Sequence, residues 1–394
     1  MDNLPTPFHD WLVALRRWLH QHPELSYQEV KTAARIAEVA ESLGLSVETG
    51  VGKTGVIARL RAKRAGPTVA LRADMDALPL DEANAVPYKS RHPGVMHACG
   101  HDAHMTIALG VARWLVESRW PEQGRGEVLF VFQPAEEGGA GARAILESGA
   151  FDPTSVAAIF AGHLQPELAV GHIGLALGVS NAASDSIRIH IIGKGGHAAH
   201  PHLCEDPIVA GAHLVTQLQT IVSRSLAPTE PAVVSIGRFL AGSAGNIIAP
   251  QARLEGTLRT LTAETRETAL ARLQELAAGL ETAFNVTVKM DINAGYPVLV
   301  NHPEVVEFTL KEGRSLLGAD RVHLQGPRMG AEDFAYFLEK TPGVMVRLGC
   351  VDPETGFQHG LHSPLFDFDE RALDAGVMLF VHLLTGFLSK EDSR

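Results

Sequence analysis

The sequence predicts an α/β fold: a mostly parallel sheet with helices on both faces, interrupted by an inserted ferredoxin-like α+β lid domain. Three observations support this prediction. Short apolar strand-like segments alternate with amphipathic helical segments in the first part of the chain, as in parallel sheets. The order changes to β-α-β-β-α-β near residue 184, and the alternation resumes beyond residue 297. The 394 residues are also enough for two domains.

The larger domain begins with two helices. Apolar residues recur at helical spacing from Phe8 to Leu19 and predict a helix that ends before Pro23. A second helix is expected over residues 27–43, ending at Gly44. The remaining elements of this domain are expected as strands at 55–60, 68–72, 127–132, 156–161 and 344–348, and as helices at 102–117, 141–147, from about 303, and 370–388.

The inserted domain has its own succession of elements. We expect strands at 186–192, 232–240, 253–260 and 286–292, and helices at 205–226 and 263–284. Four strands and two helices in this order are enough for a small independent domain. The predicted domains are therefore residues 1–183 with 297–394, and residues 184–296.

Composition excludes several classes of function. The formal net charge is −11, and no Lys/Arg run is longer than a pair, so nucleic-acid and membrane binding are not expected. No signal-peptide pattern opens the chain, and no apolar stretch is long enough for a membrane span. Three cysteines are too few and too scattered for a disulfide framework. We expect a cytoplasmic protein.

Polar residues gather where the predicted strands end. Ligands of open α/β sheets bind at the carboxyl ends of the strands, so these residues are expected at one edge. A fourth group lies in the loop before the helix at 102–117, for which Asp102 is the expected N-cap. The groups are Asp74 and Asp76 after the strand at 68–72, Glu136 and Glu137 after 127–132, His163 after 156–161, and the loop 97–102.

Cys99 and His101 favour a metal site. A thiolate and an imidazole two residues apart can bind one zinc-like cation. Cys99 could instead be a nucleophile with a histidine base, or a small buried apolar residue. The nucleophile hypothesis is weaker, because it leaves the acidic pair that follows without a role.

Glu136 and Glu137 suit metal-assisted hydrolysis. Side chains of adjacent residues diverge, so one carboxylate can bind metal while the other accepts a proton from water and passes it to a leaving amine. The alternative is a solvated acidic pair in a turn. The pair follows an apolar strand and precedes Gly138 and Gly139, which favours the functional interpretation.

Further candidates are informative only in combination with the residues above. His163 and His362 could be ordinary core and surface histidines, but they could also complete a metal site. In the inserted domain His197 lies in a glycine-rich loop, from which it could donate a hydrogen bond to an oxyanion. Asn246 and Arg259 suit a substrate carboxylate.

These motifs resemble the M20 metallopeptidase superfamily, in particular its amidohydrolase branch of hippurate hydrolases, N-acyl-amino-acid deacetylases and auxin-conjugate hydrolases. The resemblance covers essentially the whole chain. In one respect the chain departs from other members: Asp74 stands where they have a ligand histidine, so Asp76 is expected outside direct metal coordination. The motifs are residues 22–26, 72–79, 97–102, 133–139, 195–202 and 330–334.

The resemblance implies two divalent cations per subunit, Zn²⁺ or Mn²⁺, and hydrolysis of the amide bond of a small N-acyl amino acid. Glu136 would be the general acid/base, His197 would support the oxyanion, and Asn246 and Arg259 would contact substrate. A homodimer or higher homo-oligomer is expected. Alternatives are a dipeptidase or carboxypeptidase of the same superfamily, a cysteine amidase, and a non-catalytic metal-binding protein. The implied metal ligands are Cys99, His101, Glu137, His163 and His362.

Overall fold

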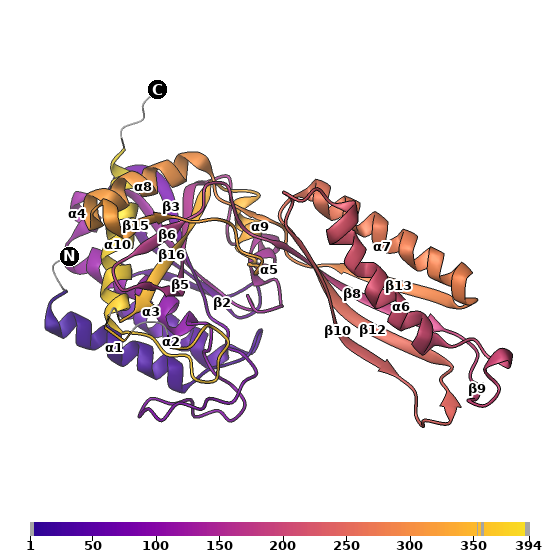
Figure 1. Cartoon of the computed structure of the whole chain (residues 1–394). Coiled ribbons are helices and arrows are strands. Elements are labelled where there is room, and N and C mark those ends of the chain that lie inside the picture. Colours follow the sequence, from indigo (N-terminus) through magenta and orange to yellow (C-terminus); the bar gives the residue numbers. More distant parts are fainter. Residues whose placement is uncertain (1–3, 353, 356–357, 391–394) are drawn as a thin grey trace. The chain divides into compact units, whose positions relative to one another are not determined.

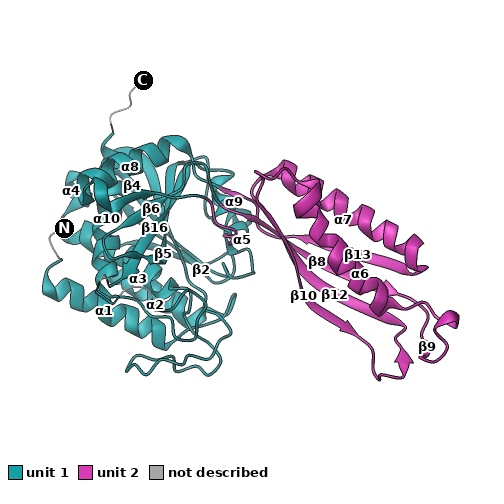
Figure 2. Ribbon diagram, in the orientation of Figure 1, with its two compact units in different colours: residues 1–180, 300–326, 333–394 teal, residues 181–299, 327–332 magenta. Residues whose placement is uncertain are grey.

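The computed structural model describes residues 4–352, 354–355 and 358–390. The chain forms two compact units, which Figures 1 and 2 show as ribbons. Unit 1 comprises Met1–Ser180, Val300–Gly326 and Asp333–Arg394, and unit 2 comprises Asn181–Leu299 and Pro327–Glu332. The short segment 327–332, which we expected in the larger domain, groups with unit 2.

Unit 1 is built on one sheet with the strand order β1-β2-β4-β3-β5-β16-β6-β15. Its centre, β4-β3-β5-β16, is parallel, as predicted. Antiparallel pairs lie toward the edges, where β1 pairs with β2, β2 with β4, and β6 with β16. The strands are β1 Ser46–Val51, β2 Gly55–Arg61, β3 Arg64–Asp74, β4 Arg125–Gln133, β5 Val156–Ala169, β6 Ile173–Leu175, β15 Val322–Leu324 and β16 Gly343–Val351.

Helices cover both faces of this sheet. Val69, Leu71 and Ala73 of β3 face one core, which includes apolar residues of α1, α2, α3, α8 and α10. The intervening Arg72 is buried on the other face, near α9. The helices of unit 1 are α1 Thr6–Gln21, α2 Val30–Ser42, α3 His101–Glu117, α4 Trp120–Gln123, α5 Gly141–Ser148, α8 Pro303–Leu317, α9 Ala335–Leu338 and α10 Arg371–Ser389, with a 3₁₀ turn at Ala319–Arg321.

Helix α10 is long and apolar enough to cross a membrane by composition alone. Leu373, Val377 and Phe380 of α10 are nevertheless buried in the core of unit 1. Its apolar character is therefore accounted for by packing within the protein.

Two local predictions were wrong. We expected His163 just beyond a strand that ends at residue 161, but β5 continues to Ala169 because β16 pairs with it through this region, with Arg347 opposite His163. We also expected Asp102 to cap its helix. Helix α3 begins at His101 with Gly100 as N-cap, at a φ of 83° that favours glycine, and Asp102 is already inside the first turn.

Unit 2 is a four-stranded antiparallel sheet, ordered β10-β12-β8-β13, with two helices packed on one face. Ile187, Ile189 and Ile191 of β8 pack in its core with Leu214 and Leu273 of the helices. The chain order β8-α6-β10-β12-α7-β13 is the β-α-β-β-α-β succession expected from the sequence. The elements are β8 Ala183–Ile192, α6 Pro207–Thr220, a π-helical turn Ile221–Ser225, β10 Ala232–Ala241, β12 Gln251–Thr260, α7 Ala263–Phe284 and β13 Thr287–Ala294.

Minor elements complete the chain. In unit 2 a two-residue strand, β9 Gly196–His197, pairs with β11 Ile247–Ile248 and is followed by a 3₁₀ turn at Pro201–Leu203. Strands β7 Val179–Asn181 and β14 Leu299–Val300 form a separate short pair.

Candidate metal centre and active site

The five expected metal ligands meet in unit 1, together with Glu136. Potential ligand atoms lie within 4.8 Å of one another in each of three sets of side chains. Cys99 belongs to two of these sets, so its sulfur lies between two neighbouring positions that a cation could take. The sets are Cys99, His101 and His163; Cys99, Glu137 and His362; and His101, Glu136 and Glu137.

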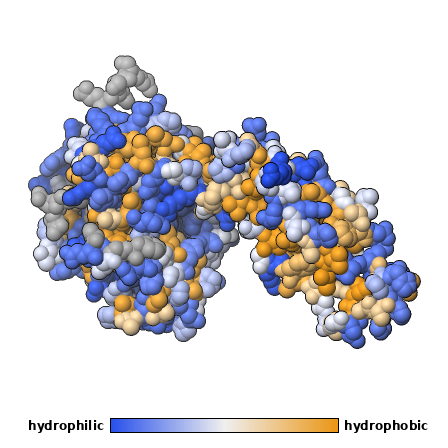
Figure 3. Space-filling view, in the orientation of Figure 1, coloured by the Kyte–Doolittle hydropathy of each residue, from blue (hydrophilic) through white to orange (hydrophobic). Residues whose placement is uncertain are grey.

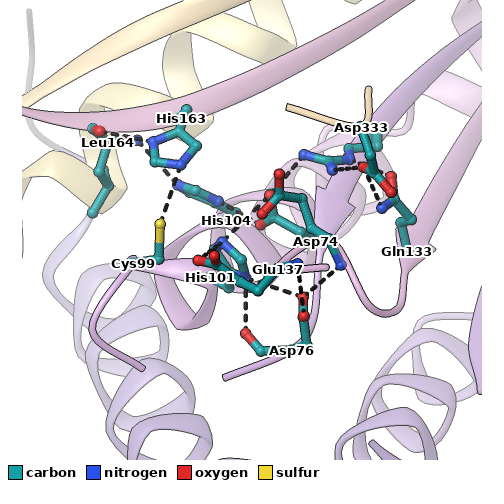
Figure 4. Close-up of polar contacts among 12 residues, drawn as sticks. Asp74, Asp76, Cys99, His101, His104, Gln133, Glu137, His163, Leu164 and Asp333 are labelled. Carbon is teal, nitrogen blue, oxygen red and sulfur yellow. Dashed lines mark hydrogen bonds and ion pairs between the residues drawn. The ribbon is translucent and has the colours of Figure 1, made fainter. Parts of the chain in front are cut away.

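Hydrogen bonds turn the histidines toward this point. The Nδ1–H of His101 donates to the backbone carbonyl of Asp76 at 2.8 Å, and the Nδ1–H of His163 donates to the carbonyl of Leu164 at 2.8 Å. In its neutral form each ring therefore keeps the Nε2 lone pair available for a metal, as in most protein metal sites. The Nε2 of His101 is buried without a hydrogen-bond partner among the described residues, and that of His163 lies 3.5 Å from Cys99 Sγ (Figure 4).

The fifth candidate ligand comes from the C-terminal part of the chain. His362 has a φ of 64°, and its backbone N–H donates to the carbonyl of Ala98 at 2.8 Å. Its Nε2 lies 3.2 Å from Glu137 Oε1. The loop that carries His362 is thus tied directly to the loop that carries Cys99 and His101.

The charges of the cluster also fit a cation. Burial opposes protonation of His101, but Asp74, Asp76 and Glu137 outweigh it and raise its pKa to about 10. Burial, with the nearby Glu137 and Glu136, raises the pKa of the Cys99 thiol well above its usual value. A cation would replace both protons, because metal ligands bind in their deprotonated forms. A buried thiol with a raised pKa is a poor nucleophile, which argues against the cysteine amidase alternative.

The turn after β4 holds the acidic pair in place. Three successive backbone N–H groups donate to buried carboxylates: Ala135 to Glu29 at 2.9 Å, and Glu136 and Glu137 to the two oxygens of Asp76 at 3.0 Å each. Ala135 has a φ of 52°, a strained conformation for a residue with a side chain. The turn is therefore stabilised by hydrogen bonds to these carboxylates and not by the intrinsic backbone preferences of its residues.

Both carboxylate oxygens of Asp76 are thus engaged by backbone N–H groups of this turn. Its Oδ2 also accepts a hydrogen bond from the Ser26 hydroxyl at 2.7 Å, and its Oδ1 lies 3.4 Å from His101 Nδ1. Glu29, which makes the neighbouring contact, was missed by sequence reasoning. An acidic residue at the start of a helix is usually a solvated residue of the first turn, and no local pattern distinguishes this buried one.

Asp102, one residue beyond His101 in α3, is part of a buried cluster with residues of α1. Its Oδ2 accepts hydrogen bonds from Arg16 Nε and His20 Nδ1, both at 2.8 Å. Arg16 also reaches Asp367 at 2.9 Å, close to the segment of His362. Helix α1 therefore anchors two segments that carry candidate ligands.

The remaining candidates lie in unit 2. His197 in β9 pairs with Ile247 of β11, and the N–H of Ala198 donates to the carbonyl of Asn246 at 3.1 Å. The Nδ1 of His197 accepts a hydrogen bond from the N–H of Ala199 at 3.1 Å, so a neutral ring carries its proton on Nε2. His197 and Asn246 are therefore neighbours, and the Nε2–H of His197 can donate a hydrogen bond.

Arg259 is far from these two residues. It lies on β12 opposite Ser184, half-buried, with a pKa lowered by burial, and its side chain has no hydrogen-bond or ion-pair partner among the described residues. His197 lies beyond the other end of this strand, which begins at Gln251. Eight residues separate Gln251 from Arg259, or about 26 Å at about 3.3 Å per residue. Within unit 2, the structure does not bring Arg259 together with His197 and Asn246.

Comparisons with known proteins bear on this arrangement. Residues 70–386 match the peptidase family M20/M25/M40. The chain is 40% identical to an N-acetyldiaminopimelate deacetylase of Halalkalibacterium halodurans over 367 residues, covering 93% of this chain and 96% of that protein. It is 38% identical to an N-acetyl-L-cysteine deacetylase of Bacillus subtilis over 366 residues, covering 92% and 84% of the two chains.

A solved structure gives the same result for the fold. The Bacillus subtilis YXEP protein, described as a dinuclear metal-binding peptidase of the M20 family, superimposes with a TM-score of 0.83. The two chains are 35% identical, and the superposition covers 98% of this chain and 100% of the other.

Proposed function

The chain belongs to the peptidase family M20/M25/M40 and is a hydrolase that acts on amide bonds, and we propose that its substrates are small N-acyl amino acids. The observation that carries the proposal is the convergence, in unit 1, of Glu136 with five side chains that could hold metal ions. The names of the two deacetylases support an acylated amino acid as substrate.

The proposed cofactors are two divalent cations. The set of Cys99, His101 and His163 would hold one, the set of Cys99, Glu137 and His362 would hold the other, and the thiolate would be shared. When bound, such ions polarise a carbonyl group and make a bound water more acidic. The thiolate favours Zn²⁺, and the carboxylate and imidazole ligands are also compatible with Mn²⁺.

Glu136 is the proposed general acid/base. It is 6% exposed, and its backbone N–H is held by Asp76. In that position the carboxylate accepts a proton from the attacking water and passes it to the departing amine. Burial in a site of low dielectric constant strengthens this role, because bulk water does not compete for the proton.

Unit 2 is the proposed lid. His197 would donate its Nε2–H to the oxyanion of the tetrahedral intermediate, and Asn246 would contact the substrate beside it. Arg259 would bind the substrate carboxylate, to which its half-buried guanidinium could donate two parallel hydrogen bonds. We propose a cytoplasmic location, in keeping with the acidic, disulfide-free composition expected from the sequence.

We propose a homodimer, and the geometry of unit 2 supports this proposal. A small N-acyl amino acid cannot span the distance of about 26 Å that β12 covers from Gln251, at the end near His197, to Arg259. If both residues act on one substrate, they come from different copies. Figure 3 shows apolar surface gathered over unit 2, and the exposed side chains include Ile208 and Val209 of α6 and Phe239 and Leu240 of the edge strand β10. Exposed apolar groups beside an unpaired strand edge suit association with a second copy.

Removal of metal tests the proposed function. A chelator should abolish hydrolysis of N-acetyl and N-benzoyl amino acids, and added Zn²⁺ or Mn²⁺ should restore it, because the clustered ligands otherwise share no purpose. Alkylation of thiols with both ions bound should leave activity intact, in contrast to a cysteine amidase. Full activity in a verified metal-free preparation would contradict the proposal, and faster cleavage of dipeptides than of N-acyl amino acids would favour the dipeptidase alternative.

A further inference from the structure

A line of buried hydrogen bonds runs behind the metal centre and ends at His163. Arg72 Nη1 donates to Asp74 Oδ2 at 2.6 Å, and His104 Nδ1 lies 2.6 Å from Asp74 Oδ1. The backbone N–H of Leu164 donates to His104 Nε2 at 3.0 Å. The carbonyl of Leu164 in turn accepts the Nδ1–H of His163 (Figure 4).

The direction of each bond is determined by its neighbours. His104 Nε2 accepts from a backbone N–H, so it carries no proton. The proton of the ring is therefore on Nδ1, which donates to the carboxylate of Asp74. Burial lowers the pKa of His104 to about 4, in agreement with a neutral ring.

This arrangement leaves neither Asp74 nor His104 free to coordinate a cation, although ligand atoms of both lie within 4.8 Å of one another and of His101. Both nitrogens of His104 are engaged, and both oxygens of Asp74 accept hydrogen bonds from side chains. Arg72 is fixed in turn, since its Nε donates to Gln133 at 2.8 Å and its Nη2 to Asp333 at 3.0 Å. All three members of the line are buried, at 4% exposure or less.

We propose that His104 and Asp74 are positioning residues that hold the Leu164 peptide group and thereby aim His163 Nε2 at the cation beside Cys99. The inference rests on the proposed function, because the ligand role of His163 is part of it. Leu164 links the two histidines, because its N–H donates to His104 and its carbonyl accepts from His163. A shift of His104 therefore alters the hydrogen bond that orients His163. The set of Cys99, Glu137 and His362 has no such link to His104 among the described contacts.

The test compares two variants of His104 with one neighbouring core variant. His104→Met removes both hydrogen bonds but keeps an apolar side chain of similar length, and His104→Gln keeps one donor and one acceptor. Ile107→Val, one helical turn farther along α3 at a position that is 2% exposed, controls for loss of packing alone. Metal-free proteins are titrated with Co²⁺, and the thiolate-to-cobalt absorption and the bound stoichiometry are followed.

We expect His104→Met to bind one of two Co²⁺ ions about 10–100-fold more weakly, the usual cost of losing a partner of a metal ligand, while the other ion stays tight. His104→Gln should recover much of that affinity, and Ile107→Val should match the unmodified protein. In addition, the imidazole nitrogen NMR spectrum of the unmodified protein should show His104 as the neutral Nδ1–H form at pH 7, a measurement that does not depend on any variant folding.

Each outcome has one meaning. Wild-type affinity for both ions in His104→Met, equal impairment in His104→Gln, or the same loss in Ile107→Val would overturn the positioning role. So would an Nε2–H or doubly protonated His104. Failure of the unmodified protein to bind two Co²⁺ ions would instead overturn the proposed metal centre.

Discussion

Glu136 and Glu137 are adjacent in the chain, yet the structure gives them different surroundings. Glu137 approaches His362 at 3.2 Å and belongs to the set that includes Cys99. Glu136 shares a set only with His101 and Glu137 among the proposed ligands. The difference arises because neighbouring side chains on a tight turn point apart, so one residue can serve the metal and the other the proton.

This difference predicts opposite results for two conservative variants. Glu136→Gln should retain both cations and lose about 10²–10⁴-fold in kcat, because proton transfer is removed at both steps. Glu137→Gln should bind metal more weakly and regain activity at high metal concentration. Metal analysis and steady-state kinetics of both variants check this, and the reverse pattern would mean that the two roles are exchanged.

His97 is a buried residue that the proposed mechanism does not use. It is 1% exposed, and neither ring nitrogen has a hydrogen-bond partner among the described residues. Burial lowers its pKa to about 3. The unfolded chain, with a histidine pKa of about 6.5, therefore takes up the proton first, so stability from this group is intact above that pH and decreases as the pH falls from 6.5 toward 3.

We expect His97→Leu to flatten this acid-induced loss by up to about 1.4 kcal/mol per pH unit between pH 6.5 and 4. Urea unfolding of the variant and the unmodified protein at pH 5 and pH 7 measures it. Between pH 7 and 8 the two proteins should show the same pH dependence, because His97 is neutral in both states there. An equal slope below pH 6.5 would show that His97 is not neutral in the folded protein.

At the scale of elements, the turn between β4 and α5 is the most constrained segment of the site. Its three N–H donors meet Glu29 and Asp76, which come from distant parts of the chain. Gly141 closes the turn, where an added Cβ would lie 1.6 Å from the carbonyl oxygen of Pro134. The orientation of Glu136 therefore depends on neighbouring elements and not only on its own strand.

Asp76→Asn tests that dependence. An amide cannot accept at both positions, so one N–H of the turn would face an NH₂ group, and we expect metal affinity or kcat to fall about 10–100-fold. Ser26→Ala is the matched control, since it removes only the hydrogen bond that the Ser26 hydroxyl donates to Asp76. It should lower the free energy of unfolding by about 1 kcal/mol and have little effect on catalysis. Equal activity in the two variants would show that Asp76 does not position the turn.

At the scale of the whole molecule, the separation within unit 2 predicts how subunits cooperate. His197→Ala should keep both metals and lose about 10²–10³-fold in kcat, as for loss of one oxyanion donor. Mixing this variant with Glu136→Gln should regenerate activity if His197 acts on the site of a partner subunit. Kinetics of the mixture, after exchange of subunits, measures it. A mixture as inactive as its parts would restrict His197 to its own chain, and an unimpaired His197→Ala would remove it from the mechanism.

Several features could be predicted because they depend on local patterns. Alternating apolar segments indicated the parallel centre of the sheet, and helix α7 begins and ends where its Ala/Leu stripe does. The expected family and amide hydrolase activity are confirmed by the comparisons. Candidate site residues, such as Cys99, His101 and the Glu136–Glu137 pair, could be selected because metal-dependent hydrolysis uses few types of side chain.

Other features depend on residues far apart in the sequence, and only the folded chain defines them. The spacing of His101 and His104, three residues apart, indicates one helical face, but not that Leu164 and Asp74 engage the second ring. Likewise the sequence predicts the same role, contact with substrate, for Asn246 and Arg259, and only the register of β12 separates them. Hydrogen-bond direction and distance follow from strand pairing and burial, which a local sequence pattern does not encode.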